Sequence, residues 1–178
     1  MTANAKPDQL RLGFLTTIEV PEKGYVGGLL VTNHCGRPLE FQCTVPVRPN
    51  PTQEILYGPT LAPFILGELI GGTLVEKAGV KPHLILTDRE QIRELRTHVD
   101  HPVALIEPQS KSADNATNET PPSLKLGRQT VRFHPAHHDD LQTVSRGFNR
   151  IPADADLQEP FDRVREALQE TLRSGALR

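Results

Sequence analysis

The chain has 178 residues, of which 37% are hydrophobic and 24% are charged, and this length favours one domain of ordinary size. Its formal net charge is −2, so the charge as a whole gives no attraction to nucleic acid or to an anionic membrane. Residues 1–9 lack the apolar segment of a signal peptide, and no apolar run approaches the roughly 20 residues that span a bilayer. Cys35 and Cys43 are too few for a disulfide framework. We therefore expect a soluble, cytoplasmic protein with no membrane partner.

Three strands are predicted in the first third of the chain. Residues 11–20 alternate between apolar and polar positions, as a half-buried strand does. A turn at 21–24 leads to a second strand at 25–33, in which two adjacent glycines indicate a bulge or a close approach by another backbone. A third strand is expected at 39–47, where Pro46 favours an edge or a strand end. Because the connections are short, we predict an antiparallel meander.

Helices and strands alternate in the middle of the chain. A helix is predicted over 60–78, with Thr60 as its N-cap and Gly79 as its C-terminal stop. A short buried strand follows at 83–87, then a second helix at 89–99 and another strand at 102–106.

The last third combines polar and amphipathic segments. Residues 108–123 are polar and are predicted to be a flexible insertion. Residues 124–133 alternate enough to form a strand, whereas 134–155 show no clear period. Asp156 can cap a final helix that extends to about residue 174, because its apolar residues recur every three or four positions.

The predicted fold class is a single mixed α/β domain over residues 10–178, after a disordered N-terminus at 1–9. Its order is a three-stranded antiparallel meander, then helix, strand, helix and strand, and finally an amphipathic helix.

Glu68 is the first candidate for a functional carboxylate. At about 100° per residue it falls in the middle of the apolar side of the helix predicted over 60–78. A carboxylate there is costly unless it is paired or bound to a cation. It is therefore either a metal ligand or general base, or a structural group paired with an arginine or a backbone amide. Gly67, Gly71 and Gly72 on the same helix would let it approach its neighbour closely.

Asp88 is the second candidate. It follows the buried strand at 83–87, at the carboxyl end where open α/β sheets place their ligands. The alternative is a structural role as a helix N-cap, with Gln91 at the third helical position as in a capping box. The cap is the favoured interpretation, because caps are far commoner than active sites.

The element order resembles that of the ribonuclease H-like superfamily, and the segment GELIGGTLVEKAGVKPHLILTDREQIRELR is similar to its central stretch. The resemblance implies that Glu68 and Asp88 are ligands of a two-metal phosphodiester site that uses Mg²⁺ or Mn²⁺. The family's first strand carries a central aspartate, whereas residues 11–20 contain only Glu19, near the strand end. The resemblance therefore implies a degenerate member. A further acid would come from the C-terminal third, where the candidates are Asp139, Asp140, Asp154, Asp156 and Asp162.

A second constellation contains His134, His137 and His138, followed by two aspartates. Imidazole and carboxylate groups together suit zinc or another transition metal. The spacing matches no closed zinc motif, so a solvated loop is the favoured interpretation and a metal site is the alternative.

Arginines and phenylalanines interleave in the same region. Such a pattern can bind a phosphate backbone and stack bases, and it is equally typical of a polar surface. The residues are Arg128, Arg132, Phe133, Arg146, Phe148 and Arg150.

The incomplete catalytic set and the long amphipathic helix together favour a non-catalytic binding or interaction module. We expect it to act with a protein partner or as a homo-oligomer, within a larger assembly; nucleic acid is not indicated by the net charge. The alternative is a divalent-metal-dependent nuclease or phosphodiesterase that uses Glu68 and Asp88.

Overall fold

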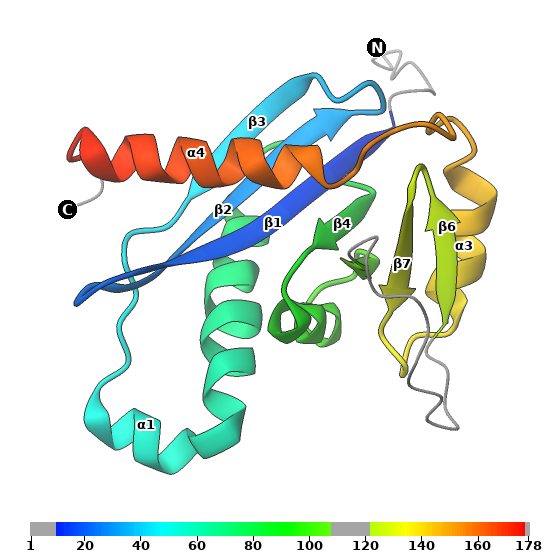
Figure 1. Ribbon diagram of the computed structural model, residues 1–178. Coiled ribbons are helices and arrows are strands. Elements are labelled where there is room, and N and C mark those ends of the chain that lie inside the picture. The colour runs from blue at the N-terminus through cyan, green and yellow to red at the C-terminus, as the bar shows by residue number, and fades with distance from the viewer. Residues whose placement is uncertain (1–9, 108–121, 177–178) are drawn as a thin grey trace, which may run out of the picture.

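One seven-stranded mixed sheet runs through the molecule, with helices on both of its faces (Figure 1). The computed structural model describes residues 10–107 and 122–176. The predicted disordered segment 1–9 and nearly all of the insertion predicted at 108–123 lie outside this range. The strands are β1 (Arg11–Val20), β2 (Gly24–Asn33), β3 (Pro38–Cys43), β4 (Leu84–Thr87), β5 (Val103–Ile106), β6 (Ser123–Leu126) and β7 (Gln129–Phe133).

The strand order is β3-β2-β1-β4-β5-β7-β6. β1, β2 and β3 form the predicted antiparallel meander, and β4 and β5 run parallel to β1. This is the strand arrangement that the predicted ribonuclease H-like order requires. The hairpin of β6 and β7 extends it antiparallel to β5. The predicted mixed α/β fold class is therefore confirmed.

The helical segments lie on opposite faces of this sheet. They are α1 (Pro51–Tyr57), η1 (Gly58–Thr60), η2 (Pro63–Gly71), α2 (Gly72–Lys77), η3 (Glu90–Thr97), α3 (Asp139–Gly147) and α4 (Glu159–Arg173). α4 packs over one face with a core that includes Phe14, Leu84 and Leu86. η2, α2 and η3 pack over the other face, against residues such as Leu15 and Ile85.

Two adjacent glycines in β2 allow helices to approach the sheet from both sides. A Cβ atom on Gly28 would lie 2.8 Å from Cγ1 of Val164 in α4, and one on Gly27 would collide with Ile70 in η2. The close approach that the sequence indicated at these glycines is thus made by helices. Phe161 of α4 is fully buried and meets Phe14 edge to face, with ring centroids 5.4 Å apart.

The helix predicted over 60–78 differs most from expectation. Its first part, η2, is a π-helix, and an additional helix, α1, precedes it. Asn50 caps α1 in a capping box with Gln53. Thr60 does not cap a helix, because its hydroxyl donates to the carbonyl of Tyr57.

The other differences lie at β3, which ends at Cys43 and not at residue 47, and at β6, β7, α3 and η3. The strand expected over 124–133 is a hairpin, in which Gly127 adopts a φ of 59°. The segment 134–155, in which the sequence shows no clear period, contains the helix α3. The second helix is the 3-10 segment η3.

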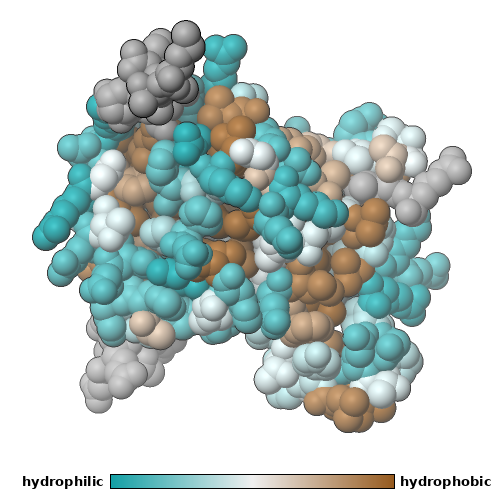
Figure 2. All heavy atoms as spheres, turned by 180° about the vertical axis from the view of Figure 1, so that it is seen from behind, coloured by the Kyte–Doolittle hydropathy of each residue, from teal (hydrophilic) through white to brown (hydrophobic). Residues whose placement is uncertain are grey.

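α1 extends from the sheet as an arm with no buried residue. Ile55 and Leu56 are 80% and 78% exposed, and Figure 2 shows an apolar patch at the tip of the arm. Among the described residues, no single helix has the length and apolar composition to cross a bilayer; only the pair of Pro51–Thr60 and Pro63–Lys77, bent by 98°, meets that test together.

Candidate functional site

Asp88 lies at the carboxyl end of β4, on the sheet face that α4 covers. Leu84 and Leu86 point into the core beneath α4, and the alternation of side chains along the strand directs Asp88 to the same face. This position is next to β1, the strand that pairs with β4. Asp88 therefore lies at the carboxyl edge of the sheet, as the sequence predicted.

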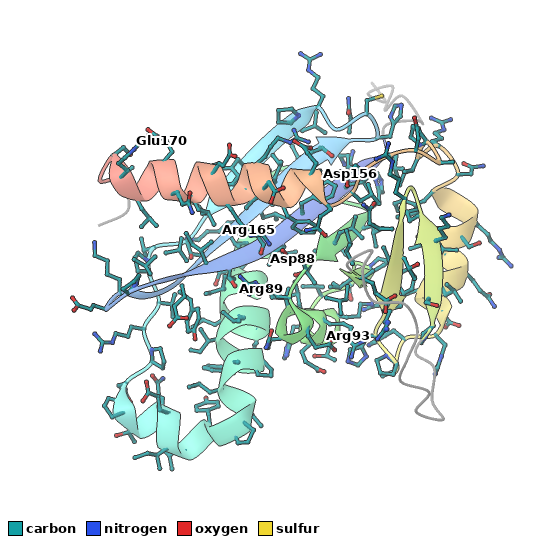
Figure 3. The ribbon with its side chains drawn as sticks, in the orientation of Figure 1. Asp88, Arg89, Arg93, Asp156, Arg165 and Glu170 are labelled. Atoms are coloured by element: carbon teal, nitrogen blue, oxygen red, sulfur yellow. The ribbon has the colours of Figure 1, made fainter. Side chains whose placement is uncertain are left out.

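Both oxygens of the Asp88 carboxylate have partners from other elements. The hydroxyl of Thr16 in β1 donates to Oδ1 at 2.6 Å, and Oδ2 forms an ion pair with Nη2 of Arg165 in α4 (Figure 3). The Asp88 side chain is 11% exposed. The predicted N-cap role is wrong, because the N-cap of η3 is Arg89, with no side-chain cap.

A cavity of about 410 Å³ opens beside Asp88, at the carboxyl ends of β4 and β5. We call it the Asp88 cavity. Its lining residues are Asp88, Ile106, Glu107, Arg128, Gln129, Asp156 and Gln158. Three of them carry carboxylates, which come from β4, β5 and the segment before α4. Topology thus gathers acids that are far apart in the chain.

The other two carboxylates of the Asp88 cavity are also compensated. Glu107 forms an ion pair with Arg132 of β7. Asp156 accepts from the side-chain amide of Gln129 at 2.8 Å and from the backbone N–H of Gln158 at 2.9 Å. Asp156 therefore closes the turn before α4 and does not act as the predicted cap, since the N-cap is Gln158.

Arg128 is the one lining residue of the Asp88 cavity that brings an uncompensated positive charge. It is exposed in the turn between β6 and β7, and its guanidinium has no carboxylate partner among residues 10–107 and 122–176. Arg165, in contrast, is paired with Asp88, and burial lowers its pKa. An arginine keeps its charge at all ordinary pH values even so.

The ribonuclease H-like resemblance implies a divalent metal ion at the carboxylates of this edge. Mg²⁺ requires several oxygen ligands in near-octahedral geometry. In the part of the chain that the structure describes, no three His, Cys, Asp or Glu side chains are close enough together to hold a metal ion. Asp88 is bound by Arg165 and Thr16. The residues as placed do not fit a metal centre.

Glu68 does not join Asp88. Its side chain is 50% exposed, and its carboxylate lies 3.7 Å from Nε2 of His98. It faces away from α4, beside a separate cavity of about 610 Å³ that Lys81 and His101 also line. The prediction of a core-facing position was wrong because η2 is a π-helix, which places more residues in each turn than the 100° projection assumes.

The predicted metal site at His134, His137 and His138 is not formed. His134 is 7% exposed, its Nδ1 accepts from the backbone N–H of Ala136, and its Nε2 lies 3.5 Å from Glu94. The rings of His134 and His137 meet edge to face. Both nitrogens of His134 thus have protein partners. His138 stands at the start of α3.

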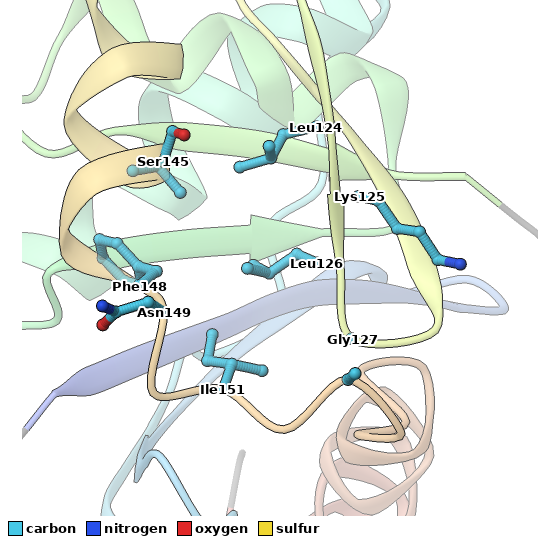
Figure 4. A pocket seen from close by; sticks show the side chains of 10 residues that line it. Leu124, Lys125, Leu126, Gly127, Ser145, Phe148, Asn149 and Ile151 are labelled. Atoms are coloured by element: carbon cyan, nitrogen blue, oxygen red, sulfur yellow. The ribbon is translucent and has the colours of Figure 1, made fainter.

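The interleaved aromatic residues are unavailable to stack bases. Phe133 is 0% exposed and Phe148 is 6% exposed. Phe148 instead lines a third cavity of about 350 Å³ between β6 and α3, which has an apolar floor of leucine and isoleucine side chains (Figure 4). Two arginines of the predicted basic group lie at the Asp88 cavity. Arg128 lines it, and Arg132 forms the ion pair with Glu107.

Sequence reasoning missed Thr16, Glu107 and Arg165. A buried threonine in a central strand and an arginine on an amphipathic helix are ordinary in isolation. One available signal was the position of Glu107, directly after β5 and therefore at the same edge as Asp88.

No protein-family model matches this chain, and no curated protein matches its sequence. Solved structures do match it. The catalytic domain of human Endonuclease V has 15% identity and a TM-score of 0.49, covering 96% of this chain and 87% of that one. Endonuclease V of Ciona intestinalis, in complex with a 23mer DNA containing an inosine followed by a ribo-adenosine, has 9% identity and a TM-score of 0.49, covering 92% and 87%.

These structures correct two predictions. They are nuclease domains, and two were solved with DNA, which contradicts a non-catalytic interaction module and a protein partner or homo-oligomer. At such identities and TM-scores below 0.5, the likeness assigns no activity or residue role to this chain.

Proposed function

We propose that this chain acts on nucleic acid and that the phosphodiester backbone is bound at the Asp88 cavity. The observation that carries the proposal is the exposed, unpaired Arg128 at a cavity on the ligand-binding edge of the sheet. Arg165 and Arg132 neutralise two of the neighbouring carboxylates, Asp88 and Glu107, while the third, Asp156, accepts hydrogen bonds from Gln129 and the backbone. A guanidinium in this setting binds a phosphate oxygen through charge-assisted hydrogen bonds.

The binding test uses fluorescence anisotropy of labelled single-stranded and double-stranded DNA and RNA over a salt series. We expect Arg128→Ala to weaken binding by roughly threefold to tenfold and to lower the salt slope by about 1, the signature of one lost phosphate contact. Lys77→Ala is the matched control, because it removes one positive charge from the exposed end of α2, on the opposite face. The proposal fails if no nucleic acid binds at low salt, or if both variants behave alike.

Cleavage of the bound backbone is a second candidate function. It is favoured by the three carboxylates that line the Asp88 cavity, because a carboxylate within reach of a water or hydroxyl can act as a general base. RNA, DNA and hybrid substrates would be incubated with Mg²⁺, Mn²⁺ or a chelator.

We expect Asp88→Asn to remove cleavage and Glu68→Gln to retain it, since Glu68 lies outside the Asp88 cavity. Loss with Glu68→Gln and retention with Asp88→Asn would place the activity elsewhere. Absence of cleavage on every substrate would reject this second candidate.

A further inference from the structure

The surroundings of Asp88 resemble a metal site in which the metal has been replaced by a side chain. Its carboxylate is nearly buried, and burying an ionised carboxylate is costly unless a cation compensates it. The cation in contact with it is the guanidinium of Arg165. Thr16, from the strand that carries an aspartate in the ribonuclease H-like resemblance, donates a hydroxyl proton to Asp88 and brings no second negative charge.

The packing of α4 fixes Arg165 in this position. Phe161, Val164 and Leu168 of the same helix are 0–1% exposed against β1 and β2, so the helix cannot rotate without opening the core. Nη1 of Arg165 also donates to Asp162 at 3.1 Å. The guanidinium is thus held between two carboxylates, one from β4 and one from its own helix.

We infer that Arg165 is the resident cation of this site and occupies the role that a divalent ion would have at Asp88. It neutralises Asp88 and satisfies one carboxylate oxygen, while Thr16 satisfies the other. Both oxygens of Asp88 therefore already have a protein partner, and the negative charge that would attract a divalent ion is neutralised. This inference concerns the charge balance of the site and does not depend on the nucleic-acid ligand.

The inference predicts a gain of metal binding when Arg165 is removed. Mn²⁺ binding to the full chain would be measured by electron paramagnetic resonance and by calorimetry. The wild-type chain should show no Asp88-dependent Mn²⁺ binding. Arg165→Ala leaves Asp88 uncompensated beside Asp156 and Glu107 in one cavity, and it should acquire Asp88-dependent Mn²⁺ binding at least tenfold tighter than any residual Mn²⁺ binding by the wild-type chain.

Three further variants make the result specific. Arg163→Ala removes a charge from the same helix, where Arg163 pairs with Glu159, and should gain nothing. The double variant Arg165→Ala/Asp88→Asn should lose the gain. Arg165→Gln keeps an amide donor and most of the side-chain length, and it carries the test if circular dichroism shows that Arg165→Ala is unfolded.

Two results would overturn the inference. One is Mn²⁺ binding by the wild-type chain that disappears in Asp88→Asn. The other is a gain in the Arg165 variants no larger than that of Arg163→Ala. Neither result bears on whether Arg128 binds a phosphate, so failure of this inference and failure of the proposed function are separable.

Discussion

At the scale of single residues, the carboxylate of Glu40 links the edge strand β3 to the end of α2. Oε2 accepts from the backbone N–H of Val80 at 2.7 Å, and Oε1 accepts from that of Gly79 at 3.0 Å. The bonds from Val80, Gln42 and Gly79 hold the pKa of Glu40 below its ordinary value, because they favour the ionised form. The edge strand is thereby tied to the helix behind it.

This linkage predicts a pH-dependent contribution to stability. A carboxyl group whose pKa is lowered on folding stabilises the folded state fully above its unfolded pKa of about 4.3. That stabilisation is lost as the pH falls through the lower folded pKa. Glu40→Gln should therefore destabilise the folded state at pH 6, by a few tenths of a kcal/mol because solvent screens this largely exposed group, and progressively less below about pH 4. Urea unfolding at several pH values would measure it. Glu76→Gln, on the exposed side of α2, is the control; an equal cost in both variants would contradict the assignment.

Single-residue predictions succeeded only where the local sequence decides the outcome. Asp88 could be placed at a strand end because the buried apolar run before it is continuous. Its partners could not, since Arg165 and Thr16 come from distant elements that only the tertiary fold brings together. The cap interpretation used local rules and was overridden by an ion pair that stabilises the carboxylate more strongly.

At the scale of elements, two glycines make the contact between η2 and η3. A Cβ atom on Gly67 would lie 2.9 Å from the backbone carbonyl oxygen of Gln91, and one on Gly71 would lie 3.1 Å from Leu95. By contrast, Gly72 has nothing within 4 Å of its Cβ position and adopts helical angles. Two of the helix's glycines are therefore needed for packing, and the third is not.

Alanine substitutions separate these two cases. Gly67→Ala should lower the free energy of unfolding by about 1–3 kcal/mol, because a backbone atom of η3 must move. Gly72→Ala should raise it by about 0.5–1 kcal/mol, because alanine restricts the unfolded chain and favours the helix. Chemical denaturation of both variants tests the prediction. Equal effects of the two substitutions would contradict a role of Gly67 in the contact between η2 and η3.

Element prediction was good where the period is clean and poor where the backbone departs from standard forms. β1, β2 and α4 follow regular alternation or a three-to-four-residue spacing, and their bounds are close to those expected. A π-helix has no standard period in the sequence, so the side of η2 that carries Glu68 could not be derived. The hairpin of β6 and β7 was missed because its two-residue turn leaves the alternation almost intact.

At the scale of the whole molecule, the pair of Arg96 and Asp140 joins η3 to α3 and so ties the C-terminal hairpin region to the rest. Arg96 donates to both carboxylate oxygens, at 2.7 and 3.2 Å, and also to the carbonyl of Val99 at 2.8 Å. The two side chains are 15% and 8% exposed. One hydrophobic core continues from β1 through Val131 to Phe148, so the hairpin region shares it.

Removing one partner of this pair should destabilise the entire described structure. Arg96→Ala leaves Asp140 as a buried, unpaired charge and should cost about 3–5 kcal/mol. Arg96→Met/Asp140→Leu should recover most of that loss, because no charge then remains buried. Arg173→Ala, which breaks the exposed pair with Glu170, should change stability by less than about 0.5 kcal/mol. Guanidinium denaturation followed by two spectroscopic probes would measure these differences; a cost below 1 kcal/mol for Arg96→Ala would contradict the role of the pair.

The central position of β1 has a consequence for how the chain folds. β1 and β2 are joined by a short turn and can pair early, but the other edge of β1 must wait for β4, where Leu12 lies opposite Leu84. Closing so long a loop costs entropy before any contact repays it. During synthesis, the meander therefore leaves the ribosome with an open strand edge that only the later βαβ segment can cover. We expect folding in the range of about milliseconds to seconds, slower than for a helical bundle of this size.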